Sequence, residues 1–456
     1  MALSRRDMLK VSGVALAATA VSGCQPAAPE EKEGAKGALL MEEPKGNRVV
    51  VIGGGFGGLT FARKLRMLNK DAEVVVLEKR DIFMSCPYSN LYLGGIEGVE
   101  FSDLTHDYYE PAAKHGYTFI QAEVTGIDRK SKTVTTTGGV IGYDMLLLSP
   151  GIAYDYEKQF PKWDAAKIRR AQQEAPGALI PGSEHLALKR QLDDLEEGNV
   201  IVTVPEGKYR CPPAPYERVA MIANYIKKEG LDAKVIVLDS LPKPKTKAAA
   251  FMEVYTELYK DIVEFRGESF LEDVDLDKKK VIYRKFKNAD DLDGYLEEED
   301  YAILNLIPLN RAHPIIEMAG VETTGWGSAL LREPGFATKT DPDIYVIGDC
   351  VSYPYPESGQ MASSMARICA QHVADRIAGK KVDEAKEMPA NVCYSMVGED
   401  PQEAIMVTHK VTYDPQNGLK VTHNVPKDEK SGKYRTRGIA KLTHEWYRGI
   451  MNDMFS

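Results

Sequence analysis

Continuous apolar runs alternate with amphipathic segments along much of this chain. Residues 48–52 (RVVVI) and 73–77 (EVVVL) are rich in β-branched side chains, as buried parallel strands are. Residues 59–68, between them, place their apolar side chains with a helical period. Strand, helix and strand in this order predict a βαβ unit with two parallel strands.

The same pattern returns later in the chain. Residues 199–205 (NVIVTVP) and 234–239 (KVIVLD) are predicted strands, and residues 216–228 between them form a predicted helix. The chain has 456 residues, of which 43% are hydrophobic and 27% charged. This is an ordinary composition for a globular protein with two or three domains, and two βαβ units indicate an α/β fold.

The turn of the first unit carries a nucleotide-binding motif. Residues 53–58 (GGGFGG) form G-x-G-x-x-G between strand and helix. Gly53 makes the tight turn, Gly55 lets the backbone approach a pyrophosphate, and Gly58 allows the helix to pack on the strand. Glu78 ends the next strand, about twenty residues further on, where a carboxylate holds ribose hydroxyls. These four residues predict a dinucleotide site.

The turn of the second unit differs completely. It reads PEGKYRCPPAP (residues 205–215), and the three prolines after Cys211 supply no amide donors. This loop is therefore not expected to cradle phosphates. It presents a cysteine where a pyridine nucleotide would otherwise bind, which argues against an NAD(P)H dehydrogenase.

A later segment indicates which dinucleotide binds. Residues 340–349 (TDPDIYVIGD) resemble the second flavin fingerprint of flavoproteins with two dinucleotide-binding domains. In those proteins the aspartate, here Asp349, binds the ribityl chain. Residues 143–151 (YDMLLLSPG) resemble the strand and crossover into their second domain. The resemblance implies FAD, and a helix over residues 360–378 would direct its N-terminal dipole toward the isoalloxazine.

The N-terminal segment is expected to be a targeting sequence. Residues 4–10 (SRRDMLK) precede a short apolar run and fit a twin-arginine export signal, and Val21-Ser22-Gly23-Cys24 resembles a bacterial lipobox. We expect a protein on the periplasmic side of a bacterial membrane, lipid-anchored through Cys24. A plain signal peptide is the alternative. No other segment has the ~18 apolar residues of a membrane span.

Charge and metal-ligand patterns exclude some functions. The net charge is −9 and there are no blocks of Lys or Arg, so no nucleic-acid partner is expected. The six cysteines form no zinc spacing and no C-x-x-C-H, so the chain should carry no c-type haem. A two-residue turn at Asn417-Gly418 would place His409 and His423 on opposite faces of a hairpin, and no metal is predicted.

The surroundings of the cysteines resemble a known family. Cys86 lies in FMSCPYSN (residues 83–90), and Cys211 lies in RCPPAPYER (residues 210–218). With NLIPLNR (305–311), NVCYS (391–395) and the terminal Trp446-Tyr447, these segments resemble the flavoprotein subunit of flavocytochrome c sulfide dehydrogenase. That family is related to the sulfide:quinone oxidoreductases. The resemblance covers nearly everything after residue 47.

The resemblance implies roles for particular residues. Cys86 would be joined covalently to the flavin; the alternative is a core cysteine near a noncovalently bound flavin. Cys211 with Cys350 would form a redox disulfide beside the flavin. Two independent thiols are the alternative reading of that pair, and Cys393 matches a family position without an assigned role. Glu217 is a candidate general base; the competing reading is a first-turn carboxylate that stabilises its helix.

The expected function is FAD-dependent oxidation of hydrosulfide to sulfur or polysulfide. Hydrosulfide would open the disulfide, and electrons would pass through FAD to a c-type cytochrome subunit or soluble cytochrome c. One alternative is a lipid-anchored sulfide:quinone oxidoreductase. Another is a non-catalytic flavin protein that carries electrons or sulfur.

The expected fold is α/β, with two Rossmann-like dinucleotide-binding domains arranged as in glutathione reductase and a smaller C-terminal α+β domain. The predicted segments are a twin-arginine and lipoprotein signal (1–24), a flexible linker (25–47), the first part of the FAD-binding domain (48–155), an NAD-like domain carrying the redox cysteine (156–300), the second part of the FAD-binding domain (301–382) and a C-terminal interface domain (383–456).

Overall fold

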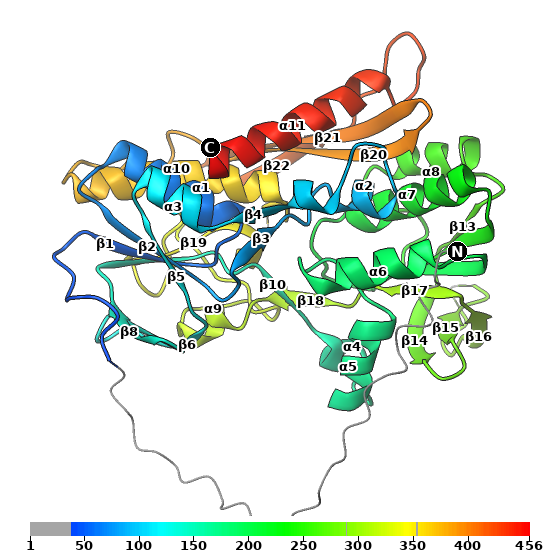
Figure 1. Ribbon diagram of the computed structural model, residues 1–456, viewed down its shortest axis with the longest axis horizontal. Coiled ribbons are helices and arrows are strands. Elements are labelled where there is room, and N and C mark those ends of the chain that lie inside the picture. The colour runs from blue at the N-terminus through cyan, green and yellow to red at the C-terminus, as the bar shows by residue number, and fades with distance from the viewer. Residues whose placement is uncertain (1–37, 289, 353) are drawn as a thin grey trace, which may run out of the picture. The chain divides into compact units, whose positions relative to one another are not determined.

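A computed structural model describes residues 38–288, 290–352 and 354–456 (Figure 1). The predicted export signal, Cys24 and most of the predicted linker lie outside the described residues. Among the helices that the structure describes, none is both long and apolar enough to span a bilayer.

The first sheet has five parallel strands. Their order is β19 (Ile344–Val346), β9 (Met145–Leu148), β1 (Arg48–Ile52), β2 (Glu73–Glu78) and β5 (Thr118–Gln121). Every residue of β1 is buried, which explains its unbroken apolar run. Helices α1 (Phe56–Leu68) and α10 (Gly359–Ile377) pack against each other and lie side by side in Figure 1. The first predicted βαβ unit is confirmed.

The second sheet has four parallel strands and contains the other predicted βαβ unit. Its order is β13 (Val263–Arg266), β12 (Asp232–Asp239), β11 (Glu197–Val204) and β17 (Ile303–Leu306). Helix α7 (Ala214–Glu229) connects β11 to β12. Because β17 pairs with β11, the chain returns to the first sheet after residue 306, later than the predicted domain start at residue 301.

The two connections between the sheets run beside each other. Strand β10 (Ile152–Tyr154) leaves the first sheet, and β18 (Asn310–Ala312) returns toward it. The two strands pair antiparallel, with Ala153 opposite Arg311. This short ribbon forms part of the boundary between the two sheets.

The C-terminal part is a separate antiparallel layer. Strands β20 (Ala390–Glu399), β21 (Gln402–Asp414) and β22 (Gly418–Asn424) form a sheet, and α11 (Arg437–Phe455) packs on it, as Figure 1 shows in orange and red. Strand β20 contacts both α7 and α10. Two Rossmann-like sheets with a smaller α+β part confirm the predicted fold class.

The remaining elements complete the chain. They are β3 (Ile82–Met84), α2 (Ser89–Leu93), η1 (Phe101–Leu104), β4 (Thr105–Asp107), α3 (Tyr109–His115), β6 (Val124–Asp128), β7 (Thr133–Thr136), β8 (Gly139–Gly142), α4 (Tyr156–Gln159), α5 (Ala165–Glu174), α6 (Ser183–Asp193), α8 (Ala248–Glu257), β14 (Phe270–Asp275), β15 (Lys280–Lys285), β16 (Tyr295–Asp300), α9 (Ile315–Met318) and η2 (Gly348–Cys350).

The β21–β22 hairpin has a different register from the one predicted. Asp414 pairs with Gly418, so the loop has three residues, and His409 lies directly opposite His423. The Asp414 carboxylate accepts hydrogen bonds from the backbone N–H groups of Gln416 and Asn417, which favours the longer loop. The predicted placement of the two imidazoles on opposite faces is therefore wrong; they share one face.

A buried tyrosine ties the start of α7 to the end of β12. The Tyr216 hydroxyl donates to Asp239 Oδ2 at 2.7 Å and accepts from the Lys245 N–H at 2.9 Å. Tyr216→Phe leaves the buried Asp239 carboxyl and the Lys245 N–H without this hydroxyl, at a cost of about 1–3 kcal/mol in the free energy of unfolding. Urea denaturation should show this loss. Tyr413→Phe, at a partly exposed site on β21, is the control and should change stability by less than about 0.5 kcal/mol.

Candidate active site

The glycine loop between β1 and α1 has the close contacts that its motif predicts. A Cβ on Gly58 would lie 1.9 Å from the Gly53 carbonyl oxygen, so only glycine lets helix and strand approach this closely. A Cβ on Gly53, whose φ is +107°, would meet the Ser149 carbonyl oxygen at 2.4 Å. At Gly55 a Cβ would meet nothing within 4 Å, which leaves open space where a pyrophosphate can approach the backbone.

Glu78 lies beside this loop at the end of β2. Its Oε2 accepts from the Gly54 N–H at 2.9 Å, and its Oε1 pairs with Arg80 Nε at 3.2 Å. Burial alone would raise the pKa of Glu78, but Arg80 and the Gly54 N–H outweigh it and lower the pKa. Glu78 is therefore a carboxylate at neutral pH, as an acceptor for ribose hydroxyls must be.

A cavity of about 110 Å³, here called the dinucleotide cavity, brings together most of the predicted cofactor residues. It is lined by Gly53, Gly55, Glu78, Cys86 and Asp349, whereas Gly58 lies outside its lining. A further cavity of about 450 Å³ shares the lining of the glycine loop and the end of β2. Together the two cavities suit an extended dinucleotide.

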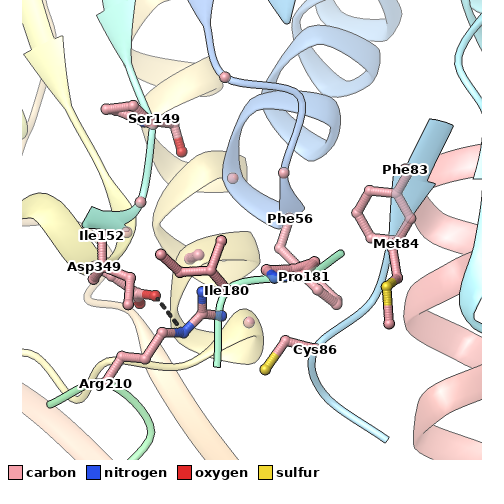
Figure 2. Close-up of a pocket in the computed structure, with 18 of the residues that line it drawn as sticks. Phe56, Phe83, Met84, Cys86, Ser149, Ile152, Ile180, Pro181, Arg210 and Asp349 are labelled. Carbon is pink, nitrogen blue, oxygen red and sulfur yellow. Dashed lines mark ion pairs between the residues drawn. The ribbon is translucent and has the colours of Figure 1, made fainter. Parts of the chain in front are cut away.

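Cys86 and Asp349 lie on different sides of the dinucleotide cavity (Figure 2). Asp349 Oδ2 is 3.3 Å from Arg210 Nε, so the ion pair joins the two parallel-sheet parts of the chain. The N-terminus of α10 also reaches this cavity. The N-cap residue of α10 is Ser358, whose hydroxyl accepts a hydrogen bond from the Met361 N–H at 3.1 Å. The positive end of a long helix thus faces the space for the flavin.

Two backbone N–H groups of the proline-rich loop donate hydrogen bonds to later segments of the chain, and these bonds position Cys211. Cys211 has a left-handed backbone (φ +53°), and its N–H donates to the Glu357 carbonyl oxygen at 3.1 Å. The Arg210 N–H donates to Asn310 Oδ1 at 2.9 Å. These two amide donors are occupied by protein acceptors, which agrees with a loop that does not bind phosphates.

Another cavity, of about 50 Å³, adjoins the dinucleotide cavity and is here called the thiol cavity. It shares Cys86, Arg210, Ser358 and Gly359 with the dinucleotide cavity, and its lining also includes Cys211, Cys393 and Glu217. The Cys211 and Cys393 thiols each shift the pKa of the other, and both cysteines are free. The structure therefore pairs Cys211 with Cys393.

The structure does not bring Cys350, the partner that the family resemblance implied, into the thiol cavity with Cys211. Cys350 is fully buried in η2, and its Sγ donates to the Ile347 carbonyl oxygen at 3.3 Å. It lines neither the dinucleotide cavity nor the thiol cavity. Burial raises the pKa of the Cys350 thiol to about 12. Its side chain belongs to the hydrophobic core around the first sheet.

The two thiols of the pair differ in acidity. The pKa of Cys393 is lowered, first because it accepts the hydrogen bond from Cys211 and second because Lys247 places a positive charge near it. The pKa of Cys211 is raised because it donates that bond and is buried. When the pair is reduced, Cys393 is therefore the sulfur that ionises first.

Glu217 lies in the first turn of α7 and lines the thiol cavity. Its Oε2 accepts from Asn90 Nδ2 at 3.1 Å, and its Oε1 accepts from the Met396 N–H at 2.9 Å. Burial raises the pKa of Glu217 to about 7, although the Asn90 bond opposes the shift. A carboxyl group of this kind can exchange a proton near neutral pH.

Arg218 and Lys247 were not singled out from the sequence. Arg218 is 1% exposed, lines the thiol cavity and donates to the Asn90 and Asn305 side chains and to two backbone carbonyls. Lys247 contacts the backbone of Cys393. Arg218 belongs to the YER motif that carries the family resemblance, but no local pattern marks Lys247.

Family models match three segments of the chain. Residues 47–163 match the pyridine nucleotide-disulphide oxidoreductase family. Residues 185–308 match the central region of the sulfide dehydrogenase [flavocytochrome c] flavoprotein chain. Residues 386–455 match the flavin-binding region of flavocytochrome c sulphide dehydrogenase. The last two segments contain Cys211 and Cys393.

Several relatives match most of the chain. A sulfide-quinone reductase from Aquifex aeolicus is 24% identical over 372 residues, covering 77% of this chain and 81% of that protein. A type II NADH:quinone oxidoreductase from Staphylococcus saprophyticus is 22% identical, covering 77% and 88%. The crystal structure of the sulfide:quinone oxidoreductase from Aquifex aeolicus has a TM-score of 0.69 at 18% identity, covering 90% of this chain and 91% of that chain.

The fold, the glycine loop and the cavity define a flavoprotein with two dinucleotide-binding domains, and its cofactor is FAD. More narrowly, the chain belongs to the family of flavocytochrome c sulfide dehydrogenase flavoproteins, which is related to the sulfide:quinone oxidoreductases. It is an FAD-dependent oxidoreductase that acts on sulfide. The family resemblance drawn from the sequence is confirmed.

A metal centre is not evident in the part of the chain that the structure describes. No three His, Cys, Asp or Glu side chains converge there in a way that could hold an ion. His409 instead contacts Asn391 Nδ2 through its Nδ1 at 3.0 Å.

The thiol pairing can be tested by mild oxidation. We expect diamide to join Cys211 to Cys393, because these two thiols are already in contact, and to leave Cys350 reduced. Peptide mass spectrometry under non-reducing conditions identifies the bond. Cys350→Ala should not change the result, whereas a bond between Cys211 and Cys350 would contradict the structure.

Proposed function

We propose that this protein oxidises hydrosulfide at a redox disulfide formed by Cys211 and Cys393 and passes the electrons through FAD to a c-type cytochrome. The observation that carries the proposal is the thiol cavity, where the pair lies beside Cys86 and next to the space for the flavin. The family model for the central region of a flavocytochrome c sulfide dehydrogenase supports it.

The sulfur chemistry is a thiol–disulfide exchange. Hydrosulfide attacks one sulfur of the Cys211–Cys393 disulfide, a new S–S bond forms, and the disulfide bond breaks. The products are a persulfide on the attacked cysteine and a thiolate on the other. When bound, FAD supplies a two-electron acceptor beside the pair, so sulfide overall loses two electrons and leaves as neutral sulfur or as polysulfide.

Glu217 can accept the proton that this reaction releases. The incoming sulfur of hydrosulfide carries one proton into the persulfide, and removing that proton makes the persulfide a better electron donor. Glu217 lines the same cavity, and its raised pKa lets its carboxylate accept that proton near neutral pH. Arg218, buried beside it, favours entry of an anion.

Two acceptors are compatible with the relatives. The matched family model describes a flavocytochrome c flavoprotein chain, which favours a cytochrome, whereas the sulfide-quinone reductase relative favours a quinone. The deciding experiment is anaerobic turnover with sulfide in the presence of either oxidised cytochrome c or a soluble ubiquinone analogue. Rapid reduction of cytochrome c alone supports the proposal. Rapid reduction of the quinone alone establishes the alternative.

The location is also proposed. The twin-arginine pattern at residues 4–10 and the lipobox ending at Cys24 support export and a lipid anchor on the periplasmic side of the membrane. Both segments lie outside the described residues. Fractionation of cells, with intact-mass measurement for a lipid on Cys24, tests this placement.

Glu217 predicts a particular pH dependence. Its pKa is raised to about 7, so it is a carboxylate above that pH and loses its ability to accept a proton below it. We expect Glu217→Gln to lower kcat/KM for sulfide about 100-fold at pH 8 and to remove this acid limb. Because the substrate ionises equally in both reactions, the ratio of the two pH profiles isolates Glu217. Glu229→Gln, at the exposed end of α7, is the control; identical profiles for Glu217→Gln and wild type would contradict the role.

Cys86 predicts a covalent flavin. Its side chain borders both cavities, and a thioether to the flavin would keep the cofactor attached after unfolding. After acid precipitation we expect yellow colour in the pellet for the wild type and for Cys211→Ala, and in the supernatant for Cys86→Ser. Absorbance at the flavin band in both fractions measures this. Free flavin released from the wild type would show that binding is noncovalent.

A further inference from the structure

Lys247 is a buried cation in an unusual position. The residue is 5% exposed, and its backbone is left-handed (φ +50°, ψ +32°) at the N-cap of α8. This backbone region is disfavoured for a long side chain, and an ammonium group is costly to bury without compensation. The surrounding structure therefore holds Lys247 in place against two unfavourable effects.

The contacts of Lys247 lead to the thiol cavity. Its Nζ donates to the Cys393 carbonyl oxygen at 3.1 Å and to Ser395 Oγ at 2.9 Å. Both partners are neutral and lie on β20. The positive charge of Lys247 acts on three titratable groups: Cys393 on β20, Glu217 on α7 and His409 on β21. It favours a lower pKa for each of them, although burial raises the pKa of Glu217 overall.

Some of the residues with a left-handed backbone lie at or near the thiol cavity. Within the described residues, seven residues other than glycine have positive φ, and among them are Tyr88, Cys211 and Lys247. Tyr88 and Cys211 line the thiol cavity, and Lys247 contacts the strand that carries Cys393. Strain of this kind persists where the surrounding structure fixes a functional geometry. It marks Lys247 as part of the arrangement that presents the two sulfurs.

The two thiols, Cys211 and Cys393, therefore have different charged groups near them. Cys393 has the ammonium group of Lys247 near it, and that ammonium has only neutral hydrogen-bond partners. Cys211 lies beside Arg210, whose charge is paired with Asp349, and near the Glu217 carboxyl. A positive charge stabilises a thiolate, and the better leaving group in disulfide exchange is the sulfur whose thiolate is more stable. The geometry thus favours one direction of attack.

We propose that Lys247 is a positioning residue that stabilises Cys393 as the departing thiolate, so that hydrosulfide attacks the sulfur of Cys211. This inference rests on the proposed function. The S–S bond between Cys211 and Cys393 breaks, a new S–S bond forms between Cys211 and the incoming sulfur, and the electron pair of the broken bond stays on Cys393. The proton of hydrosulfide remains on the new persulfide until Glu217 accepts it.

The test measures thiolate formation in the reduced holoenzyme without sulfide. Iodoacetamide labelling is followed against pH, and mass spectrometry of peptides reports Cys393 and Cys211 separately. In the wild type we expect Cys393 to react faster than Cys211 at pH 7. Lys247→Met should raise the apparent pKa of Cys393 by at least about one unit, which is a tenfold fall in the ratio of thiolate to thiol at any given pH.

Two further variants separate charge from packing. Lys247→Arg keeps the positive charge and should restore the wild-type profile of Cys393. Lys245→Met, two residues earlier, removes a lysine whose Nζ contacts the Gly207 carbonyl oxygen instead, and it should leave that profile unchanged. An unaltered Cys393 profile in Lys247→Met would overturn the proposal.

A measurement on the wild type covers the case in which Lys247→Met fails to fold. One equivalent of sulfide, added to the oxidised enzyme and quenched by alkylation, should leave the added sulfur on Cys211; its recovery on Cys393 overturns the proposal. The labelling experiment uses no sulfide, so it can fail while sulfide turnover succeeds. Absence of sulfide turnover with a normal labelling profile would instead contradict the proposed function.

Discussion

The site depends on the docking of one strand, β20, against two helices that belong to different sheets. On one side the Met396 N–H donates to Glu217 on α7 at 2.9 Å. On the other side Asn391 Oδ1 accepts from Ser358, the N-cap of α10, at 2.7 Å. Cys393 lies between these two bonds on the strand. The docking therefore brings one thiol from the C-terminal sheet to Cys211, beside the space for FAD.

The second βαβ unit shows how a nucleotide-binding shell can carry sulfur chemistry. Strands β11 and β12 and helix α7 keep the parallel arrangement of a dinucleotide-binding unit. The loop between β11 and α7 has prolines in place of glycines, and the Cys211 N–H is bonded to the Glu357 carbonyl oxygen. Amide donors that could hold phosphates are thus absent or occupied, and the loop delivers a thiol to the flavin instead.

Local motifs could be predicted from the sequence, and long-range partners could not. The glycine loop, Glu78 and Asp349 were found because each chemical requirement lies within a short segment, and the structure places all three around one site. The sequence pointed to Cys350 as the partner of Cys211, whereas the structure brings Cys393 into the same cavity, and only the docking of β20 shows this. The predicted register of the β21–β22 hairpin was also wrong, because Asp414 stabilises a loop one residue longer than the expected turn.

In the proposed reaction a thiol pair, and not a pyridine nucleotide, delivers electrons to the flavin. The most direct test is an anaerobic titration of the holoenzyme, following flavin absorbance, with sulfide and separately with NADH. We expect sulfide to bleach the flavin of the wild type and of Cys350→Ala, Cys393→Ala to respond far more slowly, and NADH to leave the spectrum unchanged. Rapid bleaching by NADH, or bleaching of Cys393→Ala by sulfide at the wild-type rate, would contradict it.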